Sequence, residues 1–304
     1  MPFGLLLVYL ASSVGSNAFA KMKSQELTHA SRAKYSLFMI LNGILASFFF
    51  WMFGGFTVNV NLPTLIYALI YAVIVAAIII LGVVTYNMMN VSSVSVRRSG
   101  CGLVCTAIVG ALLFSEEISL RTVLRIAVTF LSVIFVMLES KKQDAPRIKQ
   151  EKRAKTGTGS ILLVIVLLLT VIFECANTVT IKYFTLDTRV ADENSFFFLT
   201  NVFLVIGGAA VFAFECIRDR RVVKESIGIF KLRPMISIVG STFAANIASL
   251  VSAWIIAQMD ISVYTPVMSS IGIIAGFIGS LIYREKLGVL SYIAIIAAII
   301  AVVI

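Results

Sequence analysis

Ten apolar runs of similar length follow one another along the chain and limit what it can fold into. We place them at about 3–20, 35–56, 63–85, 94–114, 120–138, 159–180, 196–214, 235–257, 263–283 and 289–304. A run of about 20 apolar residues is long enough to cross the hydrocarbon core of a bilayer as a helix. Barrel strands would be shorter and would alternate in polarity, which these runs do not. The sequence therefore predicts an all-α polytopic membrane protein with ten transmembrane helices.

The composition supports this fold class and excludes others. Hydrophobic residues make up 60% of the 304 residues and charged residues 13%, with a mean hydropathy of +1.01. A soluble domain carries about 25% charged residues, and a chain this apolar could not solvate its own surface. A soluble enzyme, a nucleic-acid-binding protein and a secreted disulfide scaffold are therefore excluded. We expect a multi-pass integral protein of a bacterial plasma membrane.

The polar stretch 139–158, which we interpret as a basic, solvated linker, separates two halves that repeat each other. The halves are residues 1–138 and 159–304. Asn17 is matched by Asn177, and Asn42 is matched by Asn201 at nearly the same separation along the chain. Further matches follow in the same order at slightly larger separations, which indicates a duplicated unit of five helices.

A repeat unit with an odd number of spans must enter the membrane from the opposite side in its second copy. The loop charges agree with such inverted repeats. Loop 21–34 holds four Lys or Arg residues and its counterpart 181–195 holds two, whereas loop 57–62 holds none and its counterpart 215–234 holds six. One side collects 19 of the 25 basic residues. The positive-inside rule places that side and the linker in the cytoplasm, with both termini outside.

The formal net charge of +10 has the same explanation. Basic loops set membrane topology, so we expect them to lie against anionic lipid and not against nucleic acid. The sequence contains no Walker loop, no glycine-rich dinucleotide fingerprint and no zinc-binding helix motif. We therefore expect no enzymatic activity, no cofactor and no metal site. The sequence leaves open whether the chain forms a homodimer.

Two stretches carry a resemblance to a known family. They are LLFSEEISLRTVLRIAVTFLSVIFVML at 112–138 and SLIYREKLGVLSYIAIIAAIIAVVI at 280–304, each an apolar run, a glutamate, a turn and a final span. The connections MMNVSSVSVRR at 88–98 and QMDISVYTPVMSS at 258–270 lead into the fourth helix of each half. Together they resemble the EamA-type repeats of the drug/metabolite transporter superfamily. The resemblance implies a secondary transporter with a central cavity, alternating access and cytoplasmic termini; this last expectation is opposite to that of the loop charges.

The predicted function is transport of a small polar or anionic organic solute, by rocking of the two inverted halves about a site in the middle of the membrane. Two alternatives remain open. Arg97 and Arg98 are similar to a basic pair in nucleotide-sugar transporters, a branch of the same superfamily, where such residues serve the anionic part of the substrate. The other alternative is a receptor or scaffold that has a transporter-like fold and moves no solute.

Charged residues inside a membrane are costly and are functional candidates for that reason. Arg97 and Arg98, at the start of the fourth span, could hold an anionic substrate, or could extend to the interface and bind lipid phosphate. Glu174 lies deep in the sixth span. It could take up a proton and couple transport to it, or could serve helix packing as a neutralised carboxyl.

Uncharged residues complete the candidate site. Amides hydrogen-bond polar solutes and equally bond neighbouring helices, and an aromatic ring could form a stacking wall or lie in an interfacial belt. The substrate-binding candidates of this kind are Asn17, Asn42, Asn177, Asn201, Asn246 and Tyr264. Small residues on the fourth and ninth spans predict that these spans cross closely. They are Gly102, Gly110, Gly272, Gly276 and Gly279.

Overall fold

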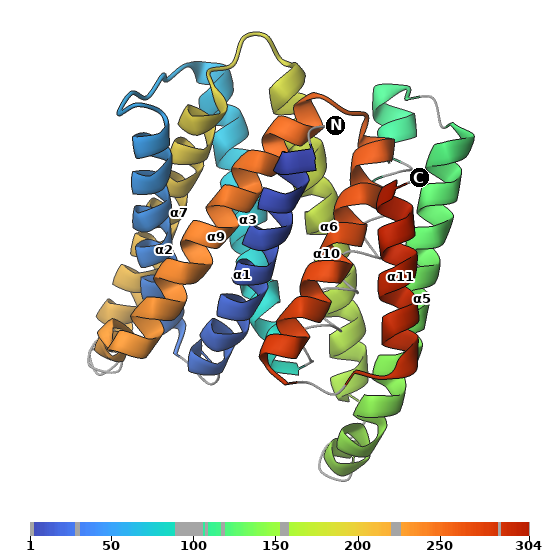
Figure 1. Cartoon of the computed structure of the whole chain (residues 1–304). Coiled ribbons are helices and arrows are strands. Elements are labelled where there is room, and N and C mark those ends of the chain that lie inside the picture. Colours follow the sequence, from blue (N-terminus) through green and yellow to red (C-terminus); the bar gives the residue numbers. More distant parts are fainter. Residues whose placement is uncertain are drawn as a thin grey trace.

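All regular elements of the described chain are helices (Figure 1). The computed structural model describes residues 3–27, 31–88, 106, 109–116, 119–152, 158–219, 226–284 and 287–303. In chain order the helices are α1 (Phe3–Leu27), α2 (Arg32–Phe53), α3 (Leu62–Met88), α5 (Leu120–Lys152), α6 (Thr158–Leu186), α7 (Glu193–Arg218), the 3-10 helix η1 (Ile227–Phe230), α9 (Leu232–Ala257), α10 (Ile261–Ile282) and α11 (Val289–Val303).

Six of the described helices are long and apolar enough to cross a membrane: α1, α2, α3, α7, α9 and α10. Their outer faces are apolar as well, because α3 leaves Ile66, Leu69, Ile70 and Val73 about half or more exposed. A large apolar surface of this kind is stable in lipid and not in water. The prediction of an α-helical membrane protein is confirmed at this level.

Each α-helix begins within three residues of the apolar run that predicts it. The helix ends differ more, because α1 continues to Leu27, past the expected end at residue 20, and α5 continues to Lys152, past residue 138. Residues 139–152, which we expected to be a solvated linker, are thus helical. Lys, Glu, Gln and Arg are good helix formers, so a helix can continue beyond the apolar segment that hydropathy detects. The expected span 94–114 is described only at residue 106 and residues 109–114, which are helical.

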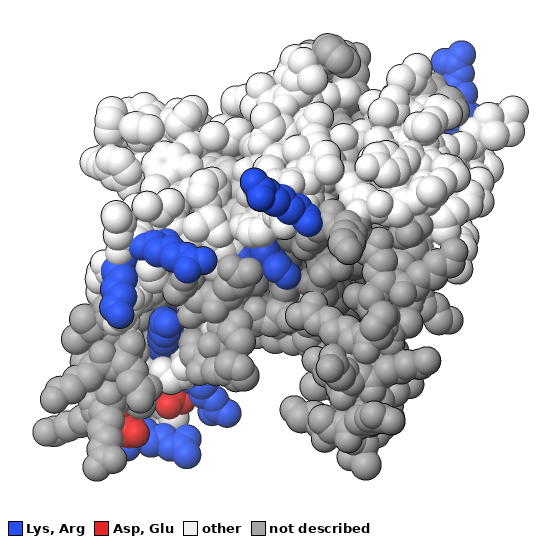
Figure 2. All heavy atoms as spheres, turned by 60° about the horizontal axis from the view of Figure 1, so that its bottom comes forward, with Lys and Arg blue, Asp and Glu red and all other residues white. Residues whose placement is uncertain are grey.

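The two ends of the helical body differ in charge. Both chain termini lie at one end, which we call the terminal end, and α5 ends and α6 begins at the opposite, basic end (Figure 1). The described Lys and Arg residues at the ends of helices on the basic side are Lys21, Lys23, Arg32, Lys34, Arg218, Lys231, Arg233 and Arg284. Figure 2 shows blue side chains spread over this face with few red ones among them.

Long-range pairs of helices build the body. The main pairs are α2 with α7, α1 with α9, α5 with α11, and α3 with both α6 and α7; α10 packs against α1, α5 and α11. Most of these pairs join one half of the chain to the other. The core is aromatic toward the terminal end, where Phe184 stacks on Phe196 with ring centroids 4.2 Å apart and Phe50 stacks on Phe197 at 4.9 Å.

Candidate functional site

Two cavities lie side by side between the helices. Cavity A has a volume of about 270 Å³ and cavity B about 240 Å³. Their common wall consists of Ser16, Asn17, Tyr71, Asn177, Ala245 and Ser249, from α1, α3, α6 and α9. Small-molecule sites are concave, mostly preformed and provided with a few convergent polar groups. The two cavities have these features, and their walls come from both halves of the chain.

Cavity A is rich in hydroxyl groups and contains one carboxyl group among its described lining residues. Its polar lining outside the common wall is Tyr9, Ser13, Thr106, Glu174, Thr178, Ser252, Tyr264, Thr265 and Ser269. The Tyr264 and Ser252 hydroxyl groups are hydrogen-bonded to each other. This bond joins α9 to α10 and fixes the Tyr264 ring in the cavity wall.

Cavity B is lined by amides on one part of its surface and by apolar side chains on the rest. Its polar lining outside the common wall is Lys23, Asn42, Thr200, Asn201, Ser241 and Asn246. Its apolar lining includes Phe50, Val75, Ile78, Ile79 and Phe197. The Lys23 ammonium lies 4.8 Å from the centroid of the Phe38 ring, a cation–π contact between α1 and α2.

The side-chain amides of Asn42 and Asn201 in cavity B each make one hydrogen bond, Asn42 to the neighbouring helix α9 and Asn201 within α7. Asn42 Oδ1 accepts a 2.6 Å hydrogen bond from Thr242 Oγ1, and Asn201 Nδ2 donates a 2.8 Å bond to the Phe197 carbonyl. Among the described residues, no hydrogen bond engages the NH₂ group of Asn42 or the side-chain carbonyl oxygen of Asn201. Asn246 Nδ2 is buried and has no bonding partner among the described residues. Groups of this kind can hydrogen-bond a polar solute.

The structure brings together every substrate-binding or proton-coupling candidate that it describes. Asn17 and Asn177 lie in the common wall, while the remaining candidates are divided between the cavities. Glu174 and Tyr264 line cavity A, and Asn42, Asn201 and Asn246 line cavity B. Arg97 and Arg98 lie outside the described residues, so the proposed anion-binding pair stays a prediction.

Of the candidate packing glycines that the structure describes, Gly272, Gly276 and Gly279 are part of α10, and Gly110 lies next to its start. Gly272 lines cavity A, and Gly276 and Gly279 are buried. A Cβ on Gly110 would lie 3.3 Å from Ile261 Cβ, so residues 109–114 approach the start of α10 closely. Gly102 lies outside the described residues, and the crossing of the fourth and ninth spans stays a prediction.

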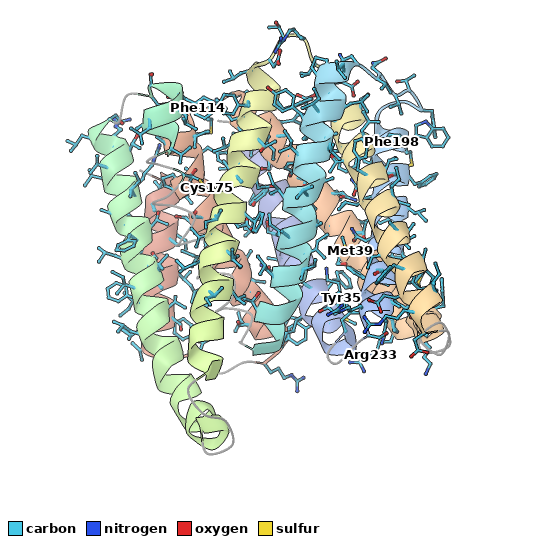
Figure 3. The ribbon with its side chains drawn as sticks, turned by 180° about the vertical axis from the view of Figure 1, so that it is seen from behind. Tyr35, Met39, Phe114, Cys175, Phe198 and Arg233 are labelled. Atoms are coloured by element: carbon cyan, nitrogen blue, oxygen red, sulfur yellow. The ribbon has the colours of Figure 1, made fainter. Side chains whose placement is uncertain are left out.

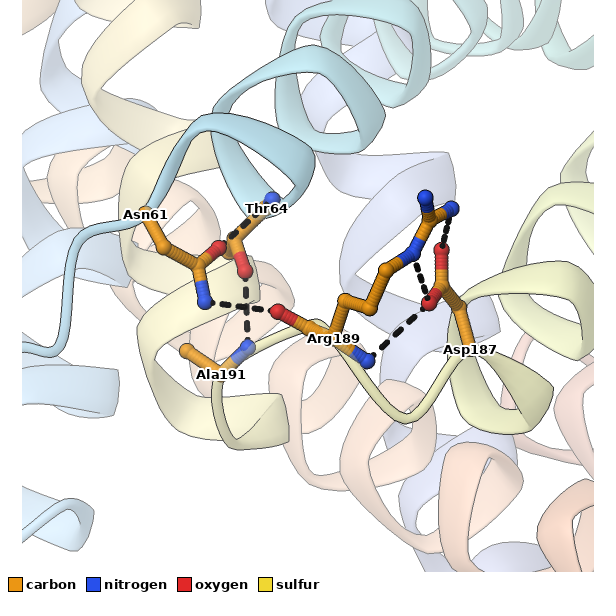
Figure 4. Close-up of polar contacts among 5 residues, drawn as sticks. All are labelled: Asn61, Thr64, Asp187, Arg189 and Ala191. Carbon is orange, nitrogen blue, oxygen red and sulfur yellow. Dashed lines mark hydrogen bonds and ion pairs between the residues drawn. The ribbon is translucent and has the colours of Figure 1, made fainter.

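A polar network joins two segments at the terminal end, and sequence reasoning did not find it (Figure 4). Asn61 Nδ2 donates to the Arg189 carbonyl at 2.9 Å, and the Ala191 N–H donates to Thr64 Oγ1 at 2.8 Å. These bonds tie the α2–α3 loop and the first turn of α3 to the α6–α7 loop, and so one half to the other. Asn and Thr are common in turns and at helix starts, which is why these two residues gave no signal in the sequence.

Two carboxyl groups of the α6–α7 loop take part in this network. Burial alone would raise the pKa of Asp192, but hydrogen bonds from the Ser195 side chain and N–H and from Asn59 bring the pKa below its usual value. Hydrogen bonds from the Arg189 side chain and N–H lower the pKa of Asp187 to about 2. Both carboxyls are therefore charged at neutral pH and hold the loops in place.

Two further charged residues that sequence reasoning missed hold helix ends. Glu116 accepts hydrogen bonds from the N–H groups of Ile261 and Ser262, at the start of α10, and Lys182 donates to carbonyls at the end of α9. Next to them Phe114 contacts the ring of Tyr183 on α6, with centroids 4.8 Å apart (Figure 3). These contacts lie toward the terminal end, opposite Arg233 at the basic end (Figure 3).

Comparison with known proteins does not extend this picture, because no family model and no curated protein matches the chain. The functional argument therefore rests on the geometry. Two polar cavities lie inside an apolar helical body, between its two halves, and aromatic and polar contacts join the halves toward one end.

Proposed function

We propose that the chain is a secondary transporter that moves a small polar organic solute across the membrane by alternating access. The observation that carries this proposal is the pair of polar cavities between helices of membrane-spanning length. Polar groups within the membrane are costly unless they are bonded or serve a function. Amide groups left without a helix partner, such as that of Asn246, are what a solute-binding site supplies.

The helix contacts support an inverted repeat. Suppose that α1, α2, α3 and α5 of the first half correspond to α6, α7, α9 and α11 of the second half. Exchanging each helix for its counterpart then turns the α1–α9 contact into an α6–α3 contact, and the α3–α7 contact into an α9–α2 contact. All of these contacts occur, and the α2–α7 and α5–α11 pairs map onto themselves. An axis between two inverted halves predicts this pattern. The halves would rock about that axis.

Backbone geometry at the helix ends supports the same correspondence. Ser115 and Arg284 occupy corresponding places in the two halves, and both have a φ of 52°, which is rare for residues other than glycine. In the sequence each comes directly before a glutamate, Glu116 or Glu285. The correspondence lies within the two stretches that resemble EamA-type repeats, and we propose membership of the drug/metabolite transporter superfamily on that resemblance.

The contacts at the terminal end support alternating access. Aromatic stacking and the hydrogen bonds of Asn61 and Thr64 join the two halves of the chain at that end, whereas cavity B reaches Lys23 and Gly82 toward the basic end. We propose that this conformation faces the basic end, and that the opposite conformation requires the terminal network to open. The loop charges place the basic end in the cytoplasm.

Glu174 is the proposed proton-coupling residue, because it is a carboxyl group in a cavity wall within a membrane-like body. A carboxyl that binds a proton on one side and releases it on the other can link solute movement to the proton gradient. The alternative of a nucleotide-sugar-type antiporter depends on Arg97 and Arg98. The described residues that line cavity A include a carboxyl group, whereas a nucleotide-sugar site requires basic residues to bind the anionic part of the substrate.

A flux measurement tests the proposal. The purified full chain is placed in proteoliposomes and given pools of labelled amino acids, amines, organic acids, sugars and nucleotide sugars, with and without a pH gradient. We expect saturable uptake of one pool, loss of it in Asn177→Ala, and no change in Gln258→Ala, since Gln258 lines neither cavity. Loss of the pH dependence in Glu174→Gln would assign the coupling.

The same measurement separates the alternatives. A folded protein that moves no pool would be a receptor or scaffold, and the transporter proposal would be wrong. Uptake of nucleotide sugars that is lost in Arg97→Ala or Arg98→Ala would favour the antiporter.

A further inference from the structure

The end of α2 and the loop that follows it present an apolar surface at the terminal end of the protein. Figure 1 shows the α2–α3 loop, residues 54–61, extending outward beyond the end of α2. The large apolar side chains that are exposed here, between 38% and 60%, are Trp51, Met52, Phe53, Phe56 and Val60. We call these residues the aromatic patch. Exposed apolar side chains gathered in one place mark a surface that contacts lipid or another molecule.

The aromatic patch lies at the depth where the hydrocarbon core of a membrane ends. The helix α2 has 22 residues, from Arg32 to Phe53, and is therefore about 33 Å long, close to the thickness of about 30 Å of that core. Because Arg32 begins α2 at the basic end, the last turn of α2 lies at the opposite membrane surface. Tryptophan and tyrosine are enriched at this depth, where lipid headgroups meet acyl chains.

Charge distinguishes the α2–α3 loop from the loop beside it. No Asp, Glu, Lys, Arg or His occurs in the sequence between Lys34 and Arg97, so the α2–α3 loop has no charged residue. The α6–α7 loop, which is hydrogen-bonded to it, contains Asp187, Arg189 and Asp192. Ionised groups favour water over an apolar environment, whereas an uncharged loop with apolar side chains has no such requirement. The two neighbouring loops are therefore suited to different surroundings.

The polar atoms of the α2–α3 loop are bonded within the protein. Four consecutive N–H groups donate to carbonyls of α2 or of the loop itself; the donors are Gly54, Gly55, Phe56 and Thr57. The Asn59 N–H donates to Ser195 Oγ at 2.9 Å, and the side chains of Asn59 and Asn61 donate to the α6–α7 loop. A loop in water can leave such groups to the solvent, but a loop in contact with lipid must satisfy them internally. The bonding pattern therefore favours contact with lipid.

Phe56 has an unfavourable backbone conformation and still leaves its ring exposed. The helix α2 ends in a glycine cap, in which Gly55 has a φ of 66° and the Phe56 N–H donates to the Trp51 carbonyl. The cap requires a positive φ at Gly55 alone, yet Phe56 has a φ of 63°, which is rare for a bulky residue. The Phe56 ring lies against Trp51, with ring centroids 5.0 Å apart, and Phe56 is 60% exposed. A costly conformation that exposes an aromatic ring indicates a contact outside the chain.

We propose that the aromatic patch is an interfacial anchor, inserted into the boundary between headgroups and acyl chains of the leaflet at the terminal end. The partner is the lipid surface, and the patch enters that boundary by about 5–10 Å, as other interfacial apolar faces do. Asn59 and Asn61 of the same loop bond to the α6–α7 loop. The anchor therefore fixes a contact between the two halves of the chain relative to the membrane surface. This inference does not depend on the proposed transport function.

Depth-dependent fluorescence quenching tests the proposal. The chain has two tryptophans, Trp51 and Trp254, and replacing both by Phe gives a background for single-tryptophan reporters. Phe56→Trp and Val60→Trp report on the aromatic patch, and Thr188→Trp, at an exposed position of the charged α6–α7 loop, is the matched control. The full chain is placed in phospholipid nanodiscs, where both membrane faces are accessible. The quenchers are aqueous iodide and phospholipids brominated on the acyl chain, either near the headgroup or near the chain end.

The quenching pattern decides where the patch lies. We expect bromine near the headgroup to quench both patch reporters about twofold or more as strongly as bromine at the chain end, and iodide to quench them less than the control. Iodide quenching equal to that of the control, without quenching by brominated lipid, would place the patch in water and overturn the proposal. Quenching by neither would show that protein, such as a second copy of the chain, covers the patch, and would overturn the proposal as well.

A substitution that relieves the backbone isolates the role of the ring. Asparagine adopts a positive φ more readily than phenylalanine does, so Phe56→Asn removes the ring without straining the loop. With the Val60→Trp reporter, we expect Phe56→Asn to raise iodide quenching about twofold or more, and Thr188→Asn to leave it unchanged. The melting temperature in detergent shows that each variant is folded. Unchanged protection from iodide in Phe56→Asn would mean that the ring does not hold the loop in the membrane, and would overturn the proposal.

Discussion

The ammonium group of Lys182 on α6 lies 2.7 Å from the main-chain carbonyl oxygen of Met259, just beyond the end of α9, and 3.1 Å from that of Ile256. The side chain is almost fully buried, with the residue 7% exposed. Carbonyl groups in the last turn of a helix have no partner within the helix and carry its partial negative charge. Lys182 therefore satisfies the end of α9 with a positive charge and ties together two helices that line both cavities.

Replacing this lysine should destabilise the protein. Lys182→Met leaves the Ile256 and Met259 carbonyls without their donor, and we expect the free energy of unfolding to fall by about 1–3 kcal/mol, the range for leaving a buried polar group unsatisfied. Denaturant or thermal unfolding in detergent measures the change. Lys231→Met is the control, since Lys231 is exposed. An unchanged melting temperature in Lys182→Met would show that the ammonium contributes nothing net to stability.

Close packing of α2 on α7 depends on a glycine. A Cβ on Gly43 would lie 2.7 Å from Val205 Cγ2, which is too close, and 3.0 Å from the Asn201 carbonyl oxygen, which is a tight contact with backbone. Gly43→Ala should therefore separate the helices and destabilise the fold by about 1–3 kcal/mol. Gly207→Ala on α7 is the matched control, because its Cβ meets nothing within 4 Å. There the higher helix propensity of alanine should leave stability unchanged or raise it by up to about 1 kcal/mol.

The helix starts and the polar residues of the site were predictable because both depend only on residues that are close together in the sequence. Asn177 and Asn201 stand out as amides within apolar runs, and an amide buried among helices requires a bonding partner or a ligand whichever way its helix turns. The division of the site into two cavities was not predictable. It depends on how each helix rotates against its neighbours, and no apolar run contains that information.

Contacts between residues that are far apart in the chain could not be predicted from the sequence either. Glu116 and Ile261 lie in different halves of the chain, as do Asn61 and Arg189, so no spacing rule links either pair. Lys182 looked like one of the few basic residues of a loop, because it lies near the expected end of its span at residue 180. The helix instead continues to Leu186 and places Lys182 inside the body.

The ion pair of Asp187 and Arg189 should make the stability of the terminal end depend on pH. Because the pKa of Asp187 is lowered to about 2 in the folded protein, against about 3.9 when unfolded, the folded state favours the charged form. The stabilising contribution is complete above the unfolded pKa and is lost as pH falls through the folded pKa. The difference in melting temperature between wild type and Asp187→Asn should thus be constant above about pH 5 and shrink toward pH 2. A difference that grew on acidification would contradict this assignment.

Glu116 provides the sharpest test of how one half of the chain supports the site in the other. Its carboxylate oxygens accept bonds of 2.7 and 2.8 Å from the N–H groups of Ile261 and Ser262, which begin the helix that carries Tyr264. Glu116→Ala removes this cap, and we expect a loss of about 1–2 kcal/mol in unfolding free energy. Glu116→Gln keeps one acceptor oxygen and should lose less.

Asp260 is the matched control for Glu116. It occupies the N-cap position of α10, but its side chain makes no capping hydrogen bond, so Asp260→Ala should change stability little. If Glu116 positions α10, then Glu116→Ala should also weaken binding of the solute at Tyr264, measured at a temperature where the variant is fully folded. Equal effects of Glu116→Ala and Asp260→Ala would mean that the start of α10 is held by its own sequence, and that the first half of the chain does not support it through Glu116.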